Sequence, residues 1–410
     1  MGGLMAGMTQ EPVSTRDSDS IEDRLREARE RARMSYQFWE HNFEEAQKDV
    51  VFLAGDQWPE SVKHEREQEW RPYLTINKLP QYVDQVVGEQ RQARPAIHVH
   101  PVEGDVGDED AKVANAAGTN DYALQDVYES IIRNIEYHSN AERHYDKAFQ
   151  QMVEGGFSWL RVLHTYSRED TFEMDLVIKA IHDRFSVIVD YQATEPDYSD
   201  MNYCFISEMM PRKEFKKRYP DARTGDITDR ELQEYNWWVT EDHVKVAEYM
   251  YREPTNRTLV LLSDGRTVWG DQLEGIKDEL KEYGITVKRE RKVKTYKVYW
   301  EKITAYDRLE GPQELPCATI PVAPVLGKEL TIGSKTYYRG IIRHAHDAQM
   351  MHNFWLTAAT EKVALAPKAP WVAPAESIEG FENEWQQANR KNLSVLRYRA
   401  LPDVQPPYRS

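Results

Sequence analysis

The stretch "RPYLTINKLPQYVDQVVGEQRQARPAIHV", residues 71–99, combines a capped amphipathic helix with a return to extended chain. Asn77 is a favourable helix cap, and Pro80 is tolerated in a first helical turn. Arg94 followed by Pro95 ends the helical geometry, and residues 96–101 then alternate like a strand. The apolar face of the predicted helix consists of Leu79, Tyr82, Val83, Val86 and Val87. The stretch therefore predicts a helix that leads into a strand, with a cluster of amides and guanidinium groups where it ends.

The composition of the whole chain limits the class of protein. A length of 410 residues exceeds the size at which one core keeps growing, so we expect two or three domains. The net charge of -16 argues against a protein that wraps nucleic acid, because phosphate binding needs clustered Lys and Arg. Cys204 and Cys317 are too few for a disulfide framework or a four-thiolate zinc site. Neither a membrane span nor a signal peptide is visible.

Helical spacing dominates several long segments. Residues 20–50 carry one apolar stripe, and we expect that helix to start at a Ser20 cap. Residues 108–153 also look mainly helical, and Gly284 would end a helix over 271–283. Further helices are predicted from about 338 to 365 and within 377–392. The stripe of the first helix consists of Ile21, Leu25, Ala28, Ala32, Tyr36, Trp39, Phe43, Ala46 and Val50.

Strand patterns fill the middle of the chain. Residues 156–210 alternate with period two and are rich in β-branched side chains, which predicts a twisted sheet. Residues 243–270 predict a hairpin with a turn at Asp264-Gly265. A strand pair is expected over 285–311, and the prolines of residues 314–327 indicate a connector. The chain is therefore of mixed α+β class.

Sequence signatures of ordinary enzymes are absent. Gly327-Lys328 continues to Glu329 and lacks the upstream Gly of a phosphate-binding loop. The dinucleotide-binding, nucleophile-elbow and zinc-protease motifs do not occur either. We therefore assign no catalytic residue, no cofactor and no metal ligand.

Three groups of histidines are candidate metal ligands: His98 with His100, His138 with His144, and His344 with His346 and Asp347. No second pair at ligand spacing accompanies the first group. His344 and His346 would point about 200 degrees apart on a helix. A solvated or interfacial role is the favoured interpretation.

One segment is densely basic in this acidic chain. This segment has two interpretations. It is either a solvated strand whose charge is balanced by acids elsewhere, or a docking edge for an acidic partner or a phosphate. The neighbouring Tyr296, Tyr299 and Trp300 favour a protein interface slightly. The basic residues are Lys288, Arg289, Arg291, Lys292, Lys294 and Lys297.

The extended motif "RPYLTINKLPQYVDQVVGEQRQARPAIHVHPV" resembles the N-terminal signature of portal proteins of tailed bacteriophages, of the podophage type. Four further stretches agree in the same order, so that the resemblance covers about residues 20–400. They are "AFQQMVEGGFSWLRV", "DRFSVIVDYQATEPDYSDMNYCF", "RGIIRHAHDAQMMHNFWLTAATEKVALAPKAPWV" and "FENEWQQANRKN".

The resemblance implies an α+β portal fold with a wing of helices and strands, a helical stem and a small clip that contains strands. Its expected divisions are a flexible N-terminus 1–19, a wing 20–265, a stem helix 266–284, a clip 285–335, a stem helix 336–365, and a tunnel-loop and wing return segment 366–410. The chain stops at "PDVQPPYRS", where relatives continue, so we expect the C-terminal crown to be absent from it.

The function implied is structural: a dodecameric ring at one capsid vertex, through which DNA is packaged and ejected. The implied partners are further copies of the chain, the terminase large subunit, a head-to-tail adaptor, scaffold and major capsid protein. Double-stranded DNA would pass without sequence specificity, and no membrane is involved. The expected location is the virion, with assembly in the host cytoplasm. A monomeric head-assembly adaptor or a metal-dependent nucleic-acid-processing enzyme are the alternatives.

Site residues follow from the resemblance and from side-chain chemistry. Arg343, Asp347, Gln349 and Asn353 match the stem and its channel. The basic strand matches the clip as a docking segment. Arg forks and amides suit polar protein interfaces better than a grip on DNA. The expected subunit-interface or wing residues are therefore Gln85, Gln90, Arg91, Gln92 and Arg94.

Overall fold

A computed structural model describes most of the chain and divides it into two compact units. Unit 1 comprises Met1–Lys48 and Val83–Ile341, and unit 2 comprises Asp49–Tyr82 and Ile342–Ser410. Each unit is considered by itself. The described residues are 15–69, 71–94, 96–99, 120–168, 170–223, 238, 242–263, 265, 267–273, 275, 280, 285–333, 335–365, 371–388, 395–402 and 405–409.

Unit 1 contains most of the strands, arranged in two larger antiparallel sheets and one hairpin. The first sheet has the order β2-β1-β9, the second has the order β3-β4-β5-β7-β8 with β6 beside β5, and β10 pairs with β11. Its strands are β1 (Phe157–Tyr166), β2 (Met174–Ala180), β3 (Val187–Val189), β4 (Tyr203–Pro211), β5 (His243–Leu262), β6 (Thr267–Trp269), β7 (Val287–Ile303), β8 (Arg308–Leu315), β9 (Val322–Leu326), β10 (Lys328–Ile332) and β11 (Lys335–Arg339).

The helices of unit 1 pack on these sheets. The unit boundaries fall within α1 and α3, so that only α1 up to Lys48 and α3 from Val83 belong to it. Helix α6 contacts β1 and β2, and α5 contacts β2. The helices are α1 (Thr15–Leu53), α3 (Leu79–Gln92), α5 (Asn120–Ser139), α6 (Ala141–Gly155) and α7 (Arg212–Arg218), with a short 3-10 turn at Arg184–Ser186.

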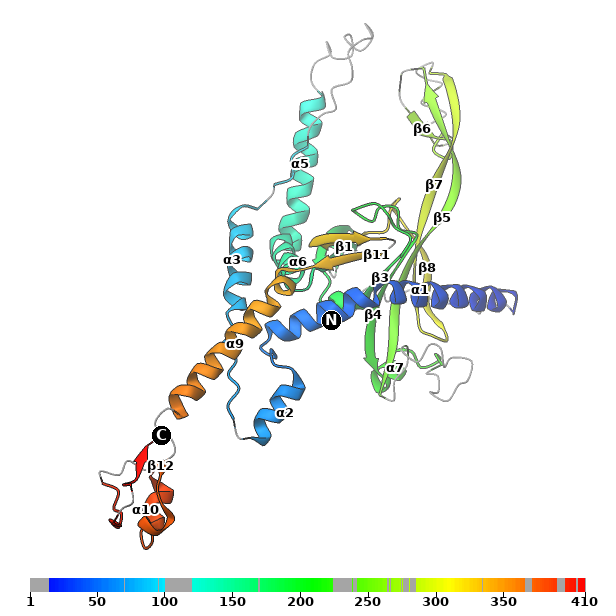
Figure 1. Ribbon diagram of the computed structural model, residues 1–410. Coiled ribbons are helices and arrows are strands. Elements are labelled where there is room, and N and C mark those ends of the chain that lie inside the picture. The colour runs from blue at the N-terminus through cyan, green and yellow to red at the C-terminus, as the bar shows by residue number, and fades with distance from the viewer. Residues whose placement is uncertain are drawn as a thin grey trace. The chain divides into compact units, whose positions relative to one another are not determined.

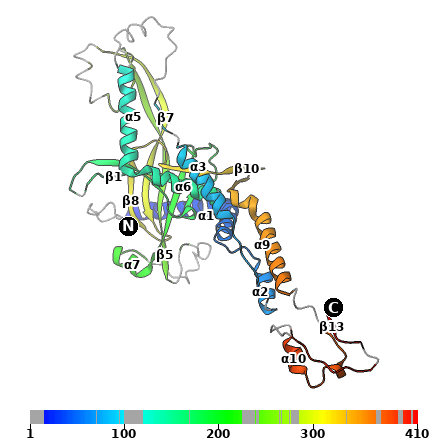
Figure 2. The same cartoon turned by 90° about the vertical axis from the view of Figure 1, so that its left-hand side faces the viewer.

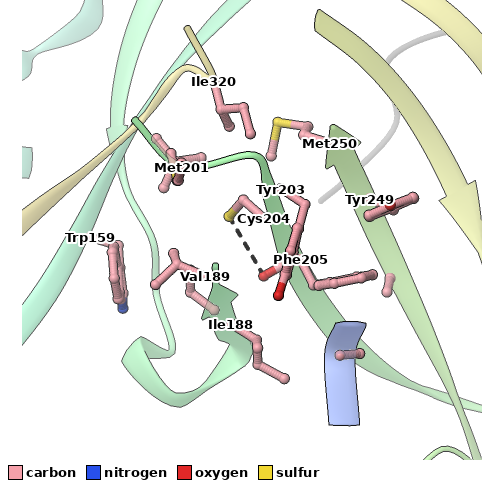
Figure 3. Close-up of a cluster of buried hydrophobic side chains, with 14 of the residues drawn as sticks. Trp159, Ile188, Val189, Met201, Tyr203, Cys204, Phe205, Tyr249, Met250 and Ile320 are labelled. Carbon is pink, nitrogen blue, oxygen red and sulfur yellow. Dashed lines mark hydrogen bonds between the residues drawn. The ribbon is translucent and has the colours of Figure 1, made fainter. Parts of the chain in front are cut away.

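The apolar stripe of α1 forms the centre of the core of unit 1. Trp39 stacks on Tyr338 of β11 with ring centroids 5.3 Å apart and meets Phe157 of β1 edge-on at 5.7 Å. The core continues between β1, β3, β4 and β5, where Figure 3 shows Phe205 beside Tyr249, and the two rings stack with centroids 4.5 Å apart. Burying this many large side chains against one helix supplies most of the apolar stabilisation of the unit.

Arginines and hydroxyl groups attach α1 to the second sheet. Arg31 donates to the Tyr249 hydroxyl at 2.6 Å, and Ser35 and the Tyr203 hydroxyl are hydrogen-bonded at 2.9 Å. Burial raises the pKa of Tyr249 to about 12, so its hydroxyl stays neutral. These two contacts give the buried hydroxyl groups of Tyr249 and Tyr203 their hydrogen-bond partners on α1.

Strands β5 and β7 extend beyond the sheet as a two-stranded arm, drawn as a long twisted ribbon in Figure 1 and Figure 2. They pair from Ala247 with Ile303 to Leu262 with Val287. Strand β8 leaves β7 after Val298, so the rest of the arm is narrower than the sheet. A small apolar cluster that includes Val260, Leu262 and Leu280 supports its far end.

Unit 2 contains α2 (Glu60–Gln68), α9 (Ile341–Leu365) from Ile342 onward and α10 (Glu382–Gln387). An extended segment, residues 71–78, follows α2. The short strands β12 (Trp371–Val372) and β13 (Tyr408–Arg409) pair antiparallel, and a 3-10 turn spans Ala375–Ser377. Trp371 meets Trp385 of α10 edge-on, with ring centroids 5.7 Å apart.

The structure confirms the α+β class and the helices predicted at 20–50, 79–92 and 338–365, with changes at their ends. Helix α1 begins at Thr15, so Ser20 is not its cap. Tyr36 is 38% exposed, because Ser35 instead faces the sheet at that turn of the helix. Tyr338 belongs to β11, and α9 begins at Ile341.

Three other predictions were wrong within the described residues. Residues 96–99 form no strand, and residues 270–273 form turns where a helix was expected from 271. The expected connector contains β9, which pairs with β1. Positions 276–279 and 281–284 of the expected helix lie outside the described residues.

We expect Trp39→Ala to lower the free energy of unfolding of unit 1 by about 3–5 kcal/mol, because the large buried ring would leave a cavity. Met34→Ala on the exposed side of the same helix is the control and should cost less than about 1 kcal/mol. Urea unfolding followed by far-ultraviolet circular dichroism, which reports on the backbone, measures the free energy of unfolding of both variants. Equal losses for the two variants would contradict the central position of Trp39.

Candidate functional site: the polar face of α9 and the basic strand β7

Three polar side chains lie buried on one face of α9. Gln349, Asn353 and Thr357 are 5%, 1% and 0% exposed and follow one another at four-residue spacing. Four residues are slightly more than one helical turn, so the three side chains form a row along the helix. Polar groups in such a position are costly unless each finds a hydrogen-bond partner.

The partners are backbone groups of the extended segment 71–78. The amide of Leu74 donates to Thr357 Oγ1 at 3.1 Å, and the amide of Ile76 donates to Asn353 Oδ1 at 3.0 Å. The amide of Lys78 donates to Gln349 Oε1 at 3.2 Å. We call this row of contacts the α9 ladder.

The geometry of the two elements explains why the ladder fits. Two extended residues advance about 6.6 Å, and four helical residues advance about 6 Å, so alternate amides meet every fourth helical side chain. Gln349 Nε2 also donates to the Ile76 carbonyl at 2.8 Å. Asn353 Nδ2 donates to Gln57 Oε1 at 2.6 Å. The ladder thus supplies the hydrogen bonds that a neighbouring strand would otherwise make to the extended segment 71–78.

A second buried polar group lies where α1 and α9 meet within unit 2. The Asp49 carboxylate, 2% exposed in its side chain, accepts from Arg343 Nε at 2.9 Å, and His346 Nε2 lies 2.9 Å from the same carboxylate. Phe52 stacks on the His346 ring at 4.0 Å. Burial raises the pKa of Asp49, and its contact with His346 acts in the opposite direction. Burial also lowers the pKa of Arg343.

The other face of α9 is open to solvent in this chain. Asp347 is exposed there, together with Met351, Trp355 and Val363, of which Trp355 is 67% exposed. Among the residues assigned to the stem and channel, Asp347 is therefore accessible, whereas Gln349 and Asn353 contact the chain itself and Arg343 holds Asp49. Their assignment to a channel stays a prediction.

The residues assigned to subunit interfaces have partners within unit 1. Arg91 Nε lies 3.1 Å from Asp146 Oδ2 of α6, and Arg94 binds both that oxygen, at 3.0 Å, and Glu142. Gln85 donates to Glu89 on its own helix at 3.1 Å, and Gln92 is exposed. Gln90 Oε1 is buried with no hydrogen-bond partner among the described residues. Both arginines therefore join α3 to α6, and a contact with another subunit stays a prediction.

The basic strand forms the outer half of β7. Lys288, Arg289, Arg291, Lys292 and Lys294 are all exposed, whereas Lys297 pairs with Glu314 of β8 at 2.9 Å. The register with β5 sets Lys292 and Lys294 opposite Thr258 and Asn256, and Arg289 and Arg291 opposite Leu261 and Leu259. Successive side chains of a strand point to opposite faces, so the two pairs of cations lie on opposite faces of the arm.

The histidine groups do not come together as metal ligands in the described part of the chain, where no cluster of three or more His, Cys, Asp or Glu could hold a metal ion. His346 binds Asp49, His344 is exposed, and His100 lies outside the described residues. The helices that the structure describes include none with the length and apolarity to cross a membrane.

Sequence reasoning missed Asp49, Gln57 and Thr357 as structural partners. The i, i+4, i+8 spacing of Gln349, Asn353 and Thr357 was visible and indicates a polar row. Nothing in the sequence identifies the extended segment 71–78 as its partner, because that contact joins residues more than 270 positions apart.

We expect Asn353→Ala to destabilise the ladder by about 2 kcal/mol, because the Ile76 amide would lose its acceptor and the buried Gln57 side chain its donor. Hydrogen exchange resolved to single amides should show faster exchange at Ile76. Met351→Ala on the exposed face of α9 is the matched control and should leave that amide protected. Unchanged exchange at Ile76 in Asn353→Ala would argue against the ladder.

We expect Arg343→Met to lower the free energy of unfolding by about 3 kcal/mol near pH 7, because Asp49 would remain buried without its cation. Since burial favours neutral Asp49 in the folded state, the folded protein takes up that proton first as the pH falls. The loss should therefore shrink as the pH is lowered and Asp49 takes up its proton, which urea unfolding at a series of pH values measures. The double variant Asp49→Asn with Arg343→Met is the control, and its free energy of unfolding should not recover as the pH falls, because Asn takes up no proton. A loss in Arg343→Met that grows on acidification would refute the pairing of Arg343 with Asp49.

Two comparisons with known proteins both point to portal proteins of phages. The model of the phage P22-like portal protein family matches residues 29–410. A portal protein from Acyrthosiphon pisum secondary endosymbiont phage 1 is 25% identical over 345 residues, which cover 82% of this chain and 46% of that protein. The chain thus spans about half the length of that curated relative. Because the family model extends over nearly the whole sequence, the chain belongs to the P22-like portal protein family.

Proposed function

We propose that the chain is a structural subunit of a phage portal, and that twelve copies form a ring at one vertex of the capsid. The observation that carries this proposal is the match of the portal family model to residues 29–410. The ring would be the channel for packaging and ejecting DNA. The ring would assemble in the host cytoplasm and then become part of the virion. Its function is mechanical and needs no catalytic residue or cofactor.

The electrostatics of the chain support a channel that does not hold DNA tightly. Each subunit has a net charge of -16, and twelve times -16 is -192 for the ring. Phosphates are repelled by such a field unless basic residues gather locally. Double-stranded DNA would therefore slide through without sequence specificity.

Unit 1 fits the proposed wing, because its helices pack on large sheets. Helix α9 fits the proposed stem helix over 336–365, and Asp347 is the residue of the predicted channel set that is free to face a bore. The other expected stem helix spans residues 266–284. The described residues at its start form strand β6 and turns instead of a helix. We keep the clip role for the basic strand of the arm, as a docking surface for terminase, adaptor, scaffold or major capsid protein. Residues 366–410 would return toward the tunnel.

A monomeric head-assembly adaptor is the second candidate. It shares the docking surfaces of the arm but forms no ring. The exposed aromatic and apolar side chains of α9, Met351 and Trp355 among them, favour the ring, because a lone subunit would leave them in water. A metal-dependent nuclease is disfavoured, since the described residues bring no carboxylate cluster together.

Light scattering or native mass spectrometry of the purified chain tests the ring. Twelve copies of 48.0 kDa weigh about 576 kDa, and we expect a particle of that mass at moderate salt. A stable species of 48.0 kDa at all accessible concentrations would favour the adaptor instead.

A single substitution tests the assignment of Arg94. We expect Arg94→Ala to weaken ring assembly by releasing Glu142 and Asp146 and loosening α3 from α6, while nonspecific DNA binding stays unchanged. Because exposed ion pairs contribute little each, the shift in the assembly midpoint should be no more than about tenfold. Arg133→Ala, which removes an exposed pair on α5 alone, is the control. An intact ring with reduced DNA binding would show that Arg94 grips DNA instead.

A further inference from the structure

The outer half of β7, residues 287–297, has a partner strand on one side alone among the described residues. Strand β5 pairs with its whole length, whereas β8 begins to pair with it at Val298. No described strand occupies the other side of this segment. A row of backbone N–H and C=O groups is therefore open there, which is the arrangement that accepts an added strand. We call residues 287–297 of β7 the arm edge.

Five exposed cations of the arm edge have no ion-pair partner in the part of the chain that the structure describes. Lys288 lies at the register shift between β5 and β7, and the other four are Lys292 and Lys294 on one face and Arg289 and Arg291 on the other. Glu290 is the one acidic residue within the edge. A concentration of unpaired positive charge is notable in a chain whose net charge is -16. It marks a surface that attracts negative charge.

Protection against aggregation is the simple explanation of charge on an edge strand. It does not account for the sign of this charge. The outer strand β8 of the same sheet carries Glu310 and Glu314, and these acids pair with Lys302 and Lys297 of the chain itself. The arm edge instead has five cations that the described residues leave without an acidic partner, so a complementary partner is the better explanation.

We propose that the arm edge binds an extended acidic segment of a partner protein by strand addition. The position of the cations on both faces decides between binding modes. A partner lying flat on one face of the arm meets two of the four cations assigned to the faces. A strand added at the edge projects its own side chains alternately to both faces and meets all four. The partner segment therefore carries acidic residues at consecutive positions. This inference deepens the docking role proposed for the basic strand and rests on that proposal.

The alternative occupant, a DNA duplex, fits the edge less well. A duplex offers phosphates but no backbone amides or carbonyls in strand geometry, so the open groups of the edge would stay unpaired. Arg252 also lies over the ring of Tyr296 and Arg257 over that of Trp269, each 4.3 Å from the ring centroid. One face of each ring is thus occupied, which leaves less of it to stack on bases.

Fluorescence anisotropy with a labelled peptide of about ten consecutive Glu residues tests the proposal on the assembled protein. We expect the pair Arg289→Gln with Arg291→Gln to weaken binding about fivefold, and the pair Lys292→Gln with Lys294→Gln to do the same. The matched control is Lys213→Gln with Lys217→Gln, which removes two exposed cations of α7 and should leave binding unchanged. A peptide methylated at alternate backbone nitrogens should bind more weakly than its parent.

Four results would overturn the proposal: no binding of the peptide, loss from one face of the arm alone, equal loss in the α7 control, or undiminished binding of the methylated peptide. A random DNA duplex that binds more tightly than the peptide and loses affinity in both arm variants would assign the edge to nucleic acid instead. The mass of each variant particle is measured in parallel. An intact ring without peptide binding refutes the arm-edge inference alone, whereas a missing ring in the unmodified protein refutes the portal proposal.

Discussion

The buried side chains of Gln349, Asn353 and Thr357 need hydrogen-bond partners, and the α9 ladder supplies them from the backbone of residues 71–78, beside which no described strand lies. Each of these buried polar groups would cost free energy if it were left without a partner. The requirement fixes the identity of three side chains on α9, since an apolar residue at Asn353 or Gln349 could not serve. It also explains why the stretch that opens the portal-like motif is extended in the middle of helical sequence.

Local sequence periodicity predicted the elements whose own residues determine them. The stripe of α1 and the apolar face of α3 are visible because helical spacing repeats over several turns. Strand β9 was missed because Pro321 and Pro324 suggested a connector. It is an edge strand in the order β2-β1-β9, where proline is tolerated because its missing N–H need not bond to a neighbour.

Contacts between distant residues could not be predicted in the same way. The four-residue spacing of Gln349, Asn353 and Thr357 is present in the sequence, but it does not identify the segment that these side chains bind. Arg91 and Arg94 looked like interface residues because Arg and Gln concentrate there, yet in the structure they bind Asp146 and Glu142 of the same chain. Residue type indicates the kind of contact, and only the fold identifies its partner.

The charge distribution separates two tasks in one subunit. The overall negative charge suits the proposed DNA channel, and the arm edge gathers positive charge where we propose that a protein partner binds. The central claim is that copies of this chain surround an opening. Electron micrographs of the purified particle, averaged along its symmetry axis, test it most directly. The account predicts a closed ring of identical subunits around a central channel, and a particle without rotational symmetry or without an opening would contradict it.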